Sequence, residues 1–394
     1  MGTPQTDADT SGHHQCQAHW NTFAAMTDTG ARETPLREMQ IRKSDLRDLR
    51  VVDVVPGPLA DGAARLRLEL FALTANNITY AAMGEGALGY WDFFPGPEGW
   101  GRPPAWGFGT VVQSNAPGVF EDSRFYGYFP IGEALDVVPA RASPRGFVDS
   151  APHRRAKAAV YNHYLNTQAD PVYDAAFEPE QAIFRPLYGT GWWAADCVHQ
   201  GKPSPRTVVF SSASSKTALA TAHQLRRLGD ARLVALTSER HVAYVRGTRL
   251  YHDTLPYEAV ASIRAEAPAV YLDFLGREAQ TAAVHRALGA NLVRSILIGA
   301  TDWGSKPGGV RPPSAALEGP RPEFFFVPDY ATVRMKADAT LGAAMLADLK
   351  AFCAASRAFV TARRLAGIDA ILQAWAQLAA GETPPNEGLV LSFG

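Results

Sequence analysis

The sequence contains few cysteines, and none of them is placed to hold a metal or to build a disulfide framework. Three occur in 394 residues, at Cys16, Cys197 and Cys353, far apart and outside any CxxC or Cys/His cluster. A catalytic or structural zinc needs three or four such ligands at characteristic spacing, so we expect no metal site. Scarce cysteine is also typical of a reducing compartment, and we expect the protein to be cytoplasmic.

Excess charge and long apolar runs are absent as well. The formal net charge is −1 and the basic residues are dispersed, which gives no support to a nucleic-acid partner. No apolar run approaches the ~20 residues that cross a bilayer, so no membrane partner is expected. Residues 1–35 are rich in Thr, Ser, Gln, His and Asp and are predicted to form a disordered leader. No GxSxG elbow or HExxH motif indicates a hydrolase.

Short strands separated by Pro/Gly turns fill the first part of the chain and predict a small β-barrel-like domain. The expected strands cover residues 51–55, 65–72, 110–113, 125–129 and 135–138. Residues 87–106 form an aromatic block that is either a rigid lid or a packed wall between domains. Its large side chains are Trp91, Phe93, Phe94, Trp100 and Trp106.

Residues 207–238 are the most informative stretch, because their pattern predicts a strand, a loop, a helix and a second strand. Such a βαβ unit offers the free amides of a helix N-terminus to a phosphate. The loop lacks the usual glycines and carries hydroxyls and one lysine instead. The candidate phosphate ligands are Ser212, Ser214, Ser215, Lys216 and Thr217. The alternative is a loop of N-capping serines whose lysine points to solvent.

The end of the second strand bears on the choice of cofactor. NAD specificity normally places an acidic residue there, whereas this strand ends in Thr237 and Ser238, followed by Glu239 and Arg240. Small hydroxyls and a guanidinium favour a 2′-phosphate, although an ordinary helix cap with a solvated arginine is the alternative. Leu275, Gly276 and Gly299 follow later strands, where the backbone can approach a nicotinamide.

Several motifs carry a resemblance to known proteins across about residues 46–393. They are LFALTANNITYAAMG, YWDFFPGPEGWGRPPAWGF, RFYGYFPI, RGFVDSAPHR, YNHYL, VVFSSASSKTA and FFFVPDY. The chain resembles the zinc-free, quinone-oxidoreductase-like branch of the medium-chain dehydrogenase/reductases, and most of all a related family of unknown function.

The resemblance implies an α/β fold with a GroES-like β-barrel catalytic domain and a Rossmann-like parallel-sheet cofactor domain. The expected boundaries are 36–185 for the catalytic domain, 186–325 for the cofactor domain, and 326–394 for a return to the catalytic domain. A homodimer formed through the edge of the cofactor domain is also implied.

By the same resemblance, the turn after the first long barrel strand faces the cleft between the domains. There Asn77 or Tyr80 would polarise a substrate oxygen, although Asn-Asn is also a common turn pair. In the YNHY block, Tyr161 and Tyr164 are expected on one helix face beside Asn162, with a tyrosine relaying a proton. The alternative is a helix that caps the barrel with half-buried tyrosines.

Together these features predict a zinc-independent oxidoreductase that uses NADP(H) to reduce a carbonyl or activated C=C of an apolar or aromatic small molecule. The glycine-free loop leaves a second hypothesis open, in which the same cleft performs a non-redox lyase, isomerase or hydrolytic reaction.

Overall fold

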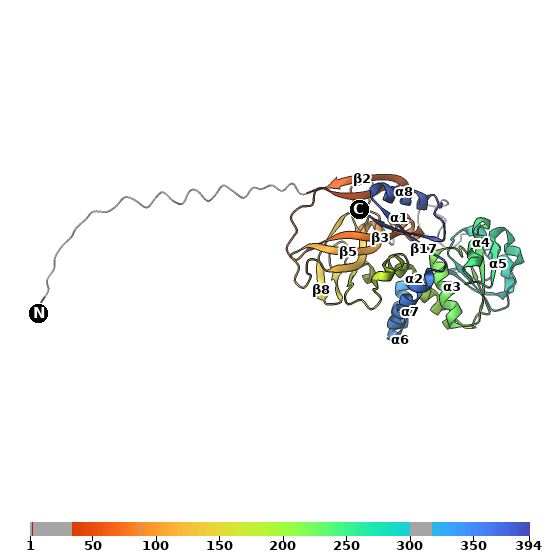
Figure 1. Cartoon of the computed structure of the whole chain (residues 1–394). Helices are drawn as coiled ribbons and strands as arrows, with labels where there is room; N and C mark the ends of the chain where they lie inside the picture. The colour runs from red at the N-terminus through yellow and green to blue at the C-terminus, as the bar shows by residue number, and fades with distance from the viewer. Residues whose placement is uncertain (1, 3–33, 87, 300–316) are drawn as a thin grey trace.

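The computed structural model describes Gly2 and residues 34–86, 88–299 and 317–394, which form two sheet-based regions joined by a long helix (Figure 1). The first region is a six-stranded sheet in the order β13-β12-β11-β14-β15-β16, and every pairing in it is parallel. Its strands are β11 (Thr207–Phe210), β12 (Arg232–Thr237), β13 (Asp253–Pro256), β14 (Ala269–Asp273), β15 (Leu292–Leu297) and β16 (Glu323–Phe324).

This parallel sheet confirms the predicted βαβ unit. β11 leads through the hydroxyl loop into α3 (Lys216–Leu228), and β12 follows. The apolar positions of α3 are buried, and the helix ends directly before Gly229, as the sequence predicts.

The second region is a larger, mostly antiparallel sheet in the order β17-β18-β3-β5-β6-β10-β9-β8, with β7 paired to β3. Its strands are β3 (Ala64–Leu73), β5 (Pro104–Ser114), β6 (Arg124–Pro130), β7 (Ala134–Val137), β8 (Pro139–Ser143), β9 (Gly146–Asp149), β10 (His163–Asn166), β17 (Thr361–Ala366) and β18 (Glu387–Ser392). A three-stranded sheet, β2-β1-β4, lies beside it. Its strands are β1 (Leu36–Arg42), β2 (Asp45–Val54) and β4 (Trp100–Gly101). The C-terminal strand β18 lies between β3 and β17, so the end of the chain completes the sheet that its beginning starts.

Eight α-helices are found in the described parts of the chain. They are α1 (Ala75–Ala82), α2 (Glu178–Gln200), α3, α4 (Val242–Gly247), α5 (Glu278–Leu288), α6 (Val327–Ala337), α7 (Leu341–Ser356) and α8 (Ile368–Ala379). The expected domain boundary at residues 185/186 falls inside α2, which packs on α3. Gly191 permits this approach, because a Cβ there would lie 2.9 Å from the amide nitrogen of Thr221.

No single helix in the described ranges is long and apolar enough to span a bilayer. Only α6 and α7 taken together pass by length and composition, and they are bent by 120°.

The helix expected over the YNHY block is wrong. Ala159–Asn162 is one 3-10 turn, and the next residues form β10, which pairs with β6 and β9. Tertiary packing overrides the helical spacing here, because the buried Tyr164 ring stacks on Phe147 at 5.0 Å. Tyr161 and Tyr164 therefore do not share a helix face.

The aromatic block is packing rather than a lid over most of its length. Trp91, Phe93 and Phe94 are each at most 3% exposed and belong to the main hydrophobic core. Trp100 lies nearer the surface, where the guanidinium of Arg50 sits 3.8 Å from its ring centroid.

Candidate functional site

The turn between β3 and α1 is built by a reciprocal cap. Thr74 precedes the helix and its hydroxyl accepts from the Asn76 amide, while the Asn77 side-chain oxygen accepts from the Thr74 amide at 2.8 Å. The Asn77 side-chain NH2 donates to the carbonyl of Pro104 at 2.9 Å. Both ends of the Asn77 amide are thus engaged by the fold, and the residue fastens α1 to β5.

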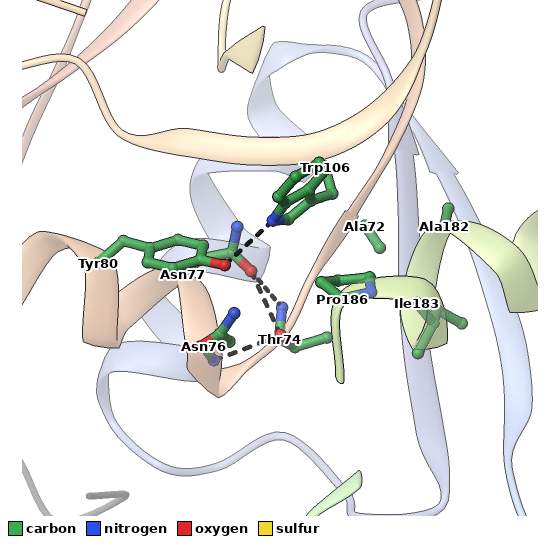
Figure 2. Close-up of a pocket in the computed structure, with 9 residues that line it drawn as sticks. All are labelled: Ala72, Thr74, Asn76, Asn77, Tyr80, Trp106, Ala182, Ile183 and Pro186. Carbon is green, nitrogen blue, oxygen red and sulfur yellow. Dashed lines mark hydrogen bonds between the residues drawn. The ribbon is translucent and has the colours of Figure 1, made fainter. Parts of the chain in front are cut away.

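Tyr80 lies one turn further along α1 and faces a small pocket between α1, β5 and α2 (Figure 2). Its hydroxyl accepts a hydrogen bond from the Trp106 indole N–H at 3.0 Å, which leaves the hydroxyl proton available for donation. The cavity measures about 10 Å³, the space of one water, so a substrate must displace side chains to reach Tyr80. The full lining is Ala72, Thr74, Asn76, Asn77, Tyr80, Trp106, Ala182, Ile183 and Pro186.

Two further tyrosines surround this hydroxyl. The rings of Tyr80 and Tyr90 lie 4.6 Å apart, and the Tyr161 ring stands edge-on to Tyr80 at 6.2 Å. The hydroxyls of Tyr90 and Tyr161 are 3.0 Å apart and form a hydrogen bond in which either hydroxyl can be the donor. Burial raises the pKa of Tyr80, Tyr90 and Tyr161 above the ordinary value of 10. At neutral pH all three are therefore neutral phenols that act as proton donors.

The rest of the YNHY block surrounds a buried arginine. Arg154 is 1% exposed, pairs with Asp149 at 2.8 Å and donates to the Asn162 side-chain oxygen at 3.0 Å. It also donates to the Tyr164 hydroxyl and to the Tyr161 carbonyl, at 3.1 and 2.6 Å. Asn162 and Tyr164 are outside the pocket lining, and with Arg154 they hold the segment that carries Tyr161.

The hydroxyl loop bonds largely to its own surroundings. The Ser215 hydroxyl caps α3 by accepting from the Ala218 amide at 3.3 Å. The Ser214 hydroxyl lies 3.3 Å from the imidazole Nδ1 of His241 and 3.4 Å from the Thr237 hydroxyl. Ser212 adopts a left-handed conformation (φ 45°) that glycine usually supplies.

A buried carboxylate that we did not predict organises the neighbouring strand ends. Asp273, at the end of β14, accepts from the Ser211 hydroxyl at 2.6 Å and from the amides of Leu275 and Gly276 at 2.9 and 3.0 Å. The backbone amide of Gly299 donates to the backbone carbonyl of Asp273 at 3.3 Å. The DFLG sequence could have predicted this role, because an aspartate at the end of an apolar strand needs hydrogen-bond partners when it is buried.

The cations of this region face the connection between α8 and β18, residues 380–386, which we name the 380–386 turn. Arg240 donates to the Gly381 carbonyl at 3.2 Å and the Lys216 ammonium to the Pro385 carbonyl at 3.5 Å. Burial lowers the pKa of Lys216 to about 8, offset in part by Glu387. The Ser238 hydroxyl is buried and has no hydrogen-bond partner within the described residues. The lysine therefore does not point to solvent, and Ser238 does not cap the helical turn after it.

The described ranges contain no group of three or more His, Cys, Asp or Glu side chains arranged to hold a metal.

The sequence profile of a family described as "protein of unknown function (DUF2855)" matches residues 71–384. The chain belongs to this family. The expectation of a family without an assigned function is thereby confirmed, while the family-specific motifs stay a prediction. No curated protein matches the chain.

Solved structures with similar folds cover 91% of the chain. CurA from Vibrio vulnificus in complex with NADPH is 13% identical, with a TM-score of 0.58 over 99% of its own chain. A putative NADPH:quinone reductase from Mesorhizobium loti is 15% identical, with a TM-score of 0.58 over 98%. An alcohol dehydrogenase from Pyrobaculum aerophilum is 14% identical, with a TM-score of 0.54 over 99%. These similarities confirm the predicted GroES-like and Rossmann-like fold.

The donor set at the carboxyl end of the parallel sheet fits an anionic dinucleotide. The backbone amides of Lys216 and Thr217 at the start of α3 donate no hydrogen bond within the described residues. Two cations and the unpartnered Ser238 hydroxyl lie at the same edge of the sheet. This is the edge at which open parallel sheets bind their ligands.

Proposed function

We propose that the protein is an NADP(H)-dependent, zinc-independent oxidoreductase that reduces a carbonyl or an activated C=C of an apolar or aromatic small molecule. The Tyr80 hydroxyl carries the proposal, because it is a buried neutral donor whose proton is free and whose oxygen is held by Trp106. A donor fixed in an apolar site stabilises negative charge that develops on a substrate oxygen.

The residues of this chain divide into two roles in the proposal. The α3 amides, Lys216 and Arg240 would hold the phosphates, and bound NADPH would supply a hydride. Tyr80 would donate its hydroxyl proton to the substrate oxygen. Tyr161, hydrogen-bonded to Tyr90, would reprotonate Tyr80, and a proton from bulk water would then restore the pair. The fold similarity to CurA in complex with NADPH and to a putative NADPH:quinone reductase supports the choice of cofactor.

A binding experiment tests the proposal. We expect NADPH to raise the melting temperature of the full chain and to quench its tryptophan fluorescence, with NADH acting only at higher concentration. Turnover is then sought with quinones, enones and aromatic aldehydes in the presence of NADPH. The absence of any response to NADPH and NADH in the folded protein would refute the redox proposal.

One observation favours the second candidate, a non-redox reaction in the same cleft. The loop hydroxyls of Ser211, Ser214 and Ser215 all have partners within the protein, and the Ser212 amide donates to the Tyr257 hydroxyl at 3.0 Å. A loop that fills its own space leaves less room for a pyrophosphate. Failure of both nucleotides to bind would promote this candidate, and Tyr80 would remain its donor.

A further inference from the structure

The 380–386 turn belongs to the strand-rich region, yet it receives the polar side chains of the parallel-sheet region. Besides the bonds from Lys216 and Arg240, the hydroxyl of Tyr244 on α4 lies 3.4 Å from the Pro385 carbonyl and 3.2 Å from that of Phe359. Lys216 on α3, Tyr244 on α4 and Arg240 after β12 thus all donate to carbonyl oxygens of the strand-rich region.

These carbonyl oxygens are weak acceptors for such donors. The bond lengths of 3.2–3.5 Å exceed the usual ~2.9 Å of an N–H···O bond, and the acceptors are neutral. A charged oxygen forms shorter bonds that are roughly twice as strong. An anion can therefore replace these carbonyls at little loss.

Two hydroxyls at this junction have no partner. The oxygens of Ser238, on the β12 side, and of Thr383, inside the 380–386 turn, are buried without a hydrogen bond within the described residues. Buried hydroxyls are normally satisfied. These two lie two residues along the chain from Arg240 and from Gly381, which contact each other. The nearby carboxylate of Glu387 pairs with Arg363 at 3.2 Å.

We propose that the 380–386 turn is the capping half of a phosphate pocket, and that Thr383 and Ser238 donate their hydroxyl protons to the 2′-phosphate of NADP(H). The inference rests on the proposed function and adds a specificity residue from the opposite region. A phosphate has three acceptor oxygens, enough for Arg240 and both hydroxyls. The 2′-hydroxyl of NADH supplies one oxygen and no charge, and leaves the donors unmatched.

Isothermal titration of the full chain with NADPH, NADH and adenosine 2′,5′-bisphosphate tests this inference. Thr383→Val keeps the shape of the side chain and removes only the hydroxyl. We expect it to weaken NADPH and the bisphosphate by about tenfold or more, the value of a hydrogen bond to a charged group, and to leave NADH unchanged. Thr383→Ser should restore binding. Thr332→Val, on the exposed side of α6, is the matched control and should bind as the wild type does.

The outcomes separate the two proposals. If the wild type binds NADPH while Thr383→Val and Ser238→Ala retain its preference over NADH, the capping role of the turn is refuted and the proposed function stands. If the wild type binds neither nucleotide, the proposed function fails and the pocket fails with it. Because the Thr383 hydroxyl has no partner, the melting temperature of the free variant should match that of the wild type and show that it is folded.

Discussion

The pocket at Tyr80 and the carboxyl end of the parallel sheet are both rich in hydroxyls, but the two regions hold them differently. At the pocket, the Tyr80–Trp106 bond is 3.0 Å long, and so is the Tyr90–Tyr161 bond beside it, where the Tyr90 ring packs on the Tyr80 ring. At the carboxyl end of the sheet, Lys216 and Arg240 donate to carbonyls of the 380–386 turn at 3.5 and 3.2 Å. The pocket is therefore organised by packed rings, whereas the donors at the carboxyl end of the sheet make longer bonds to neutral carbonyls.

The largest effect should come from the buried ion pair beneath the tyrosines. Arg154→Met leaves Asp149 buried and unpaired, and we expect the free energy of unfolding to fall by about 3–5 kcal/mol in denaturant titration. Arg206→Met is the matched control, because its pair with Glu266 is exposed at both partners and should contribute about 0–1 kcal/mol. Equal losses in the two variants would show that the segment carrying Tyr161 is not organised by Arg154.

Tyr80→Phe tests the pocket from the chemical side. It removes the donor without changing the ring, so kcat should fall by about 10²–10³-fold while NADPH binding is unchanged. Tyr330→Phe is a control outside the pocket lining, where the hydroxyl donates to Asp196. Wild-type turnover in Tyr80→Phe would remove this residue from the mechanism.

The affinity for NADPH should depend on pH through Lys216. Burial lowers the pKa of Lys216 to about 8, and a bound phosphate restores the charged form. Below pH 8 the lysine is protonated in both the free and bound protein. Above it, binding must take up a proton, so NADPH affinity should fall by up to about tenfold per pH unit.

Two neighbouring groups stay neutral in this window. Burial raises the pKa of the Tyr244 hydroxyl, which donates to the same Pro385 carbonyl as Lys216. Burial lowers the pKa of His241, so it is neutral above pH 8. Lys216→Arg keeps a permanent charge and should flatten the pH profile of NADPH affinity between pH 7 and 9. A profile that stays steep in this variant would exclude the lysine.

The smallest effect concerns the cap of α3. Ser215→Ala should lower the free energy of unfolding by about 1 kcal/mol, because the Ala218 amide loses its acceptor, and Ser215→Gly by only a few tenths. A thermal melt of both variants measures the difference. An unchanged stability in Ser215→Ala would mean that the hydroxyl is free to serve a ligand.

The sequence predicted the parallel sheet well because its signals are local. The apolar run of β11, the amphipathic α3 and the stop at Gly229 each follow from a short stretch of residues. The return of the C-terminus came from resemblance instead, since no local pattern tells a strand which distant partner it has. The pairing of β18 with β3 now accounts for that return.

The site was predictable only in part, for the same reason. Asn77 and Tyr80 follow a recognisable strand and turn, and the structure brings the Tyr161 ring to that of Tyr80. The YNHY spacing suggested a helix, but Tyr164 enters the core and draws the segment into β10. Asp273 was missed, because its partner Ser211 lies 62 residues away in the sequence.

The placement of β18 also sets the order in which the chain can fold during synthesis. Arg37 donates to the carbonyl of Phe393, which is 356 residues away, and β3 receives β18 only once the last residues have emerged. The parallel sheet, whose strands come from the middle of the chain, has its partners available earlier. We therefore expect the ribosome-bound chain to fold its parallel sheet first, with the edge of β3 exposed until β18 has emerged.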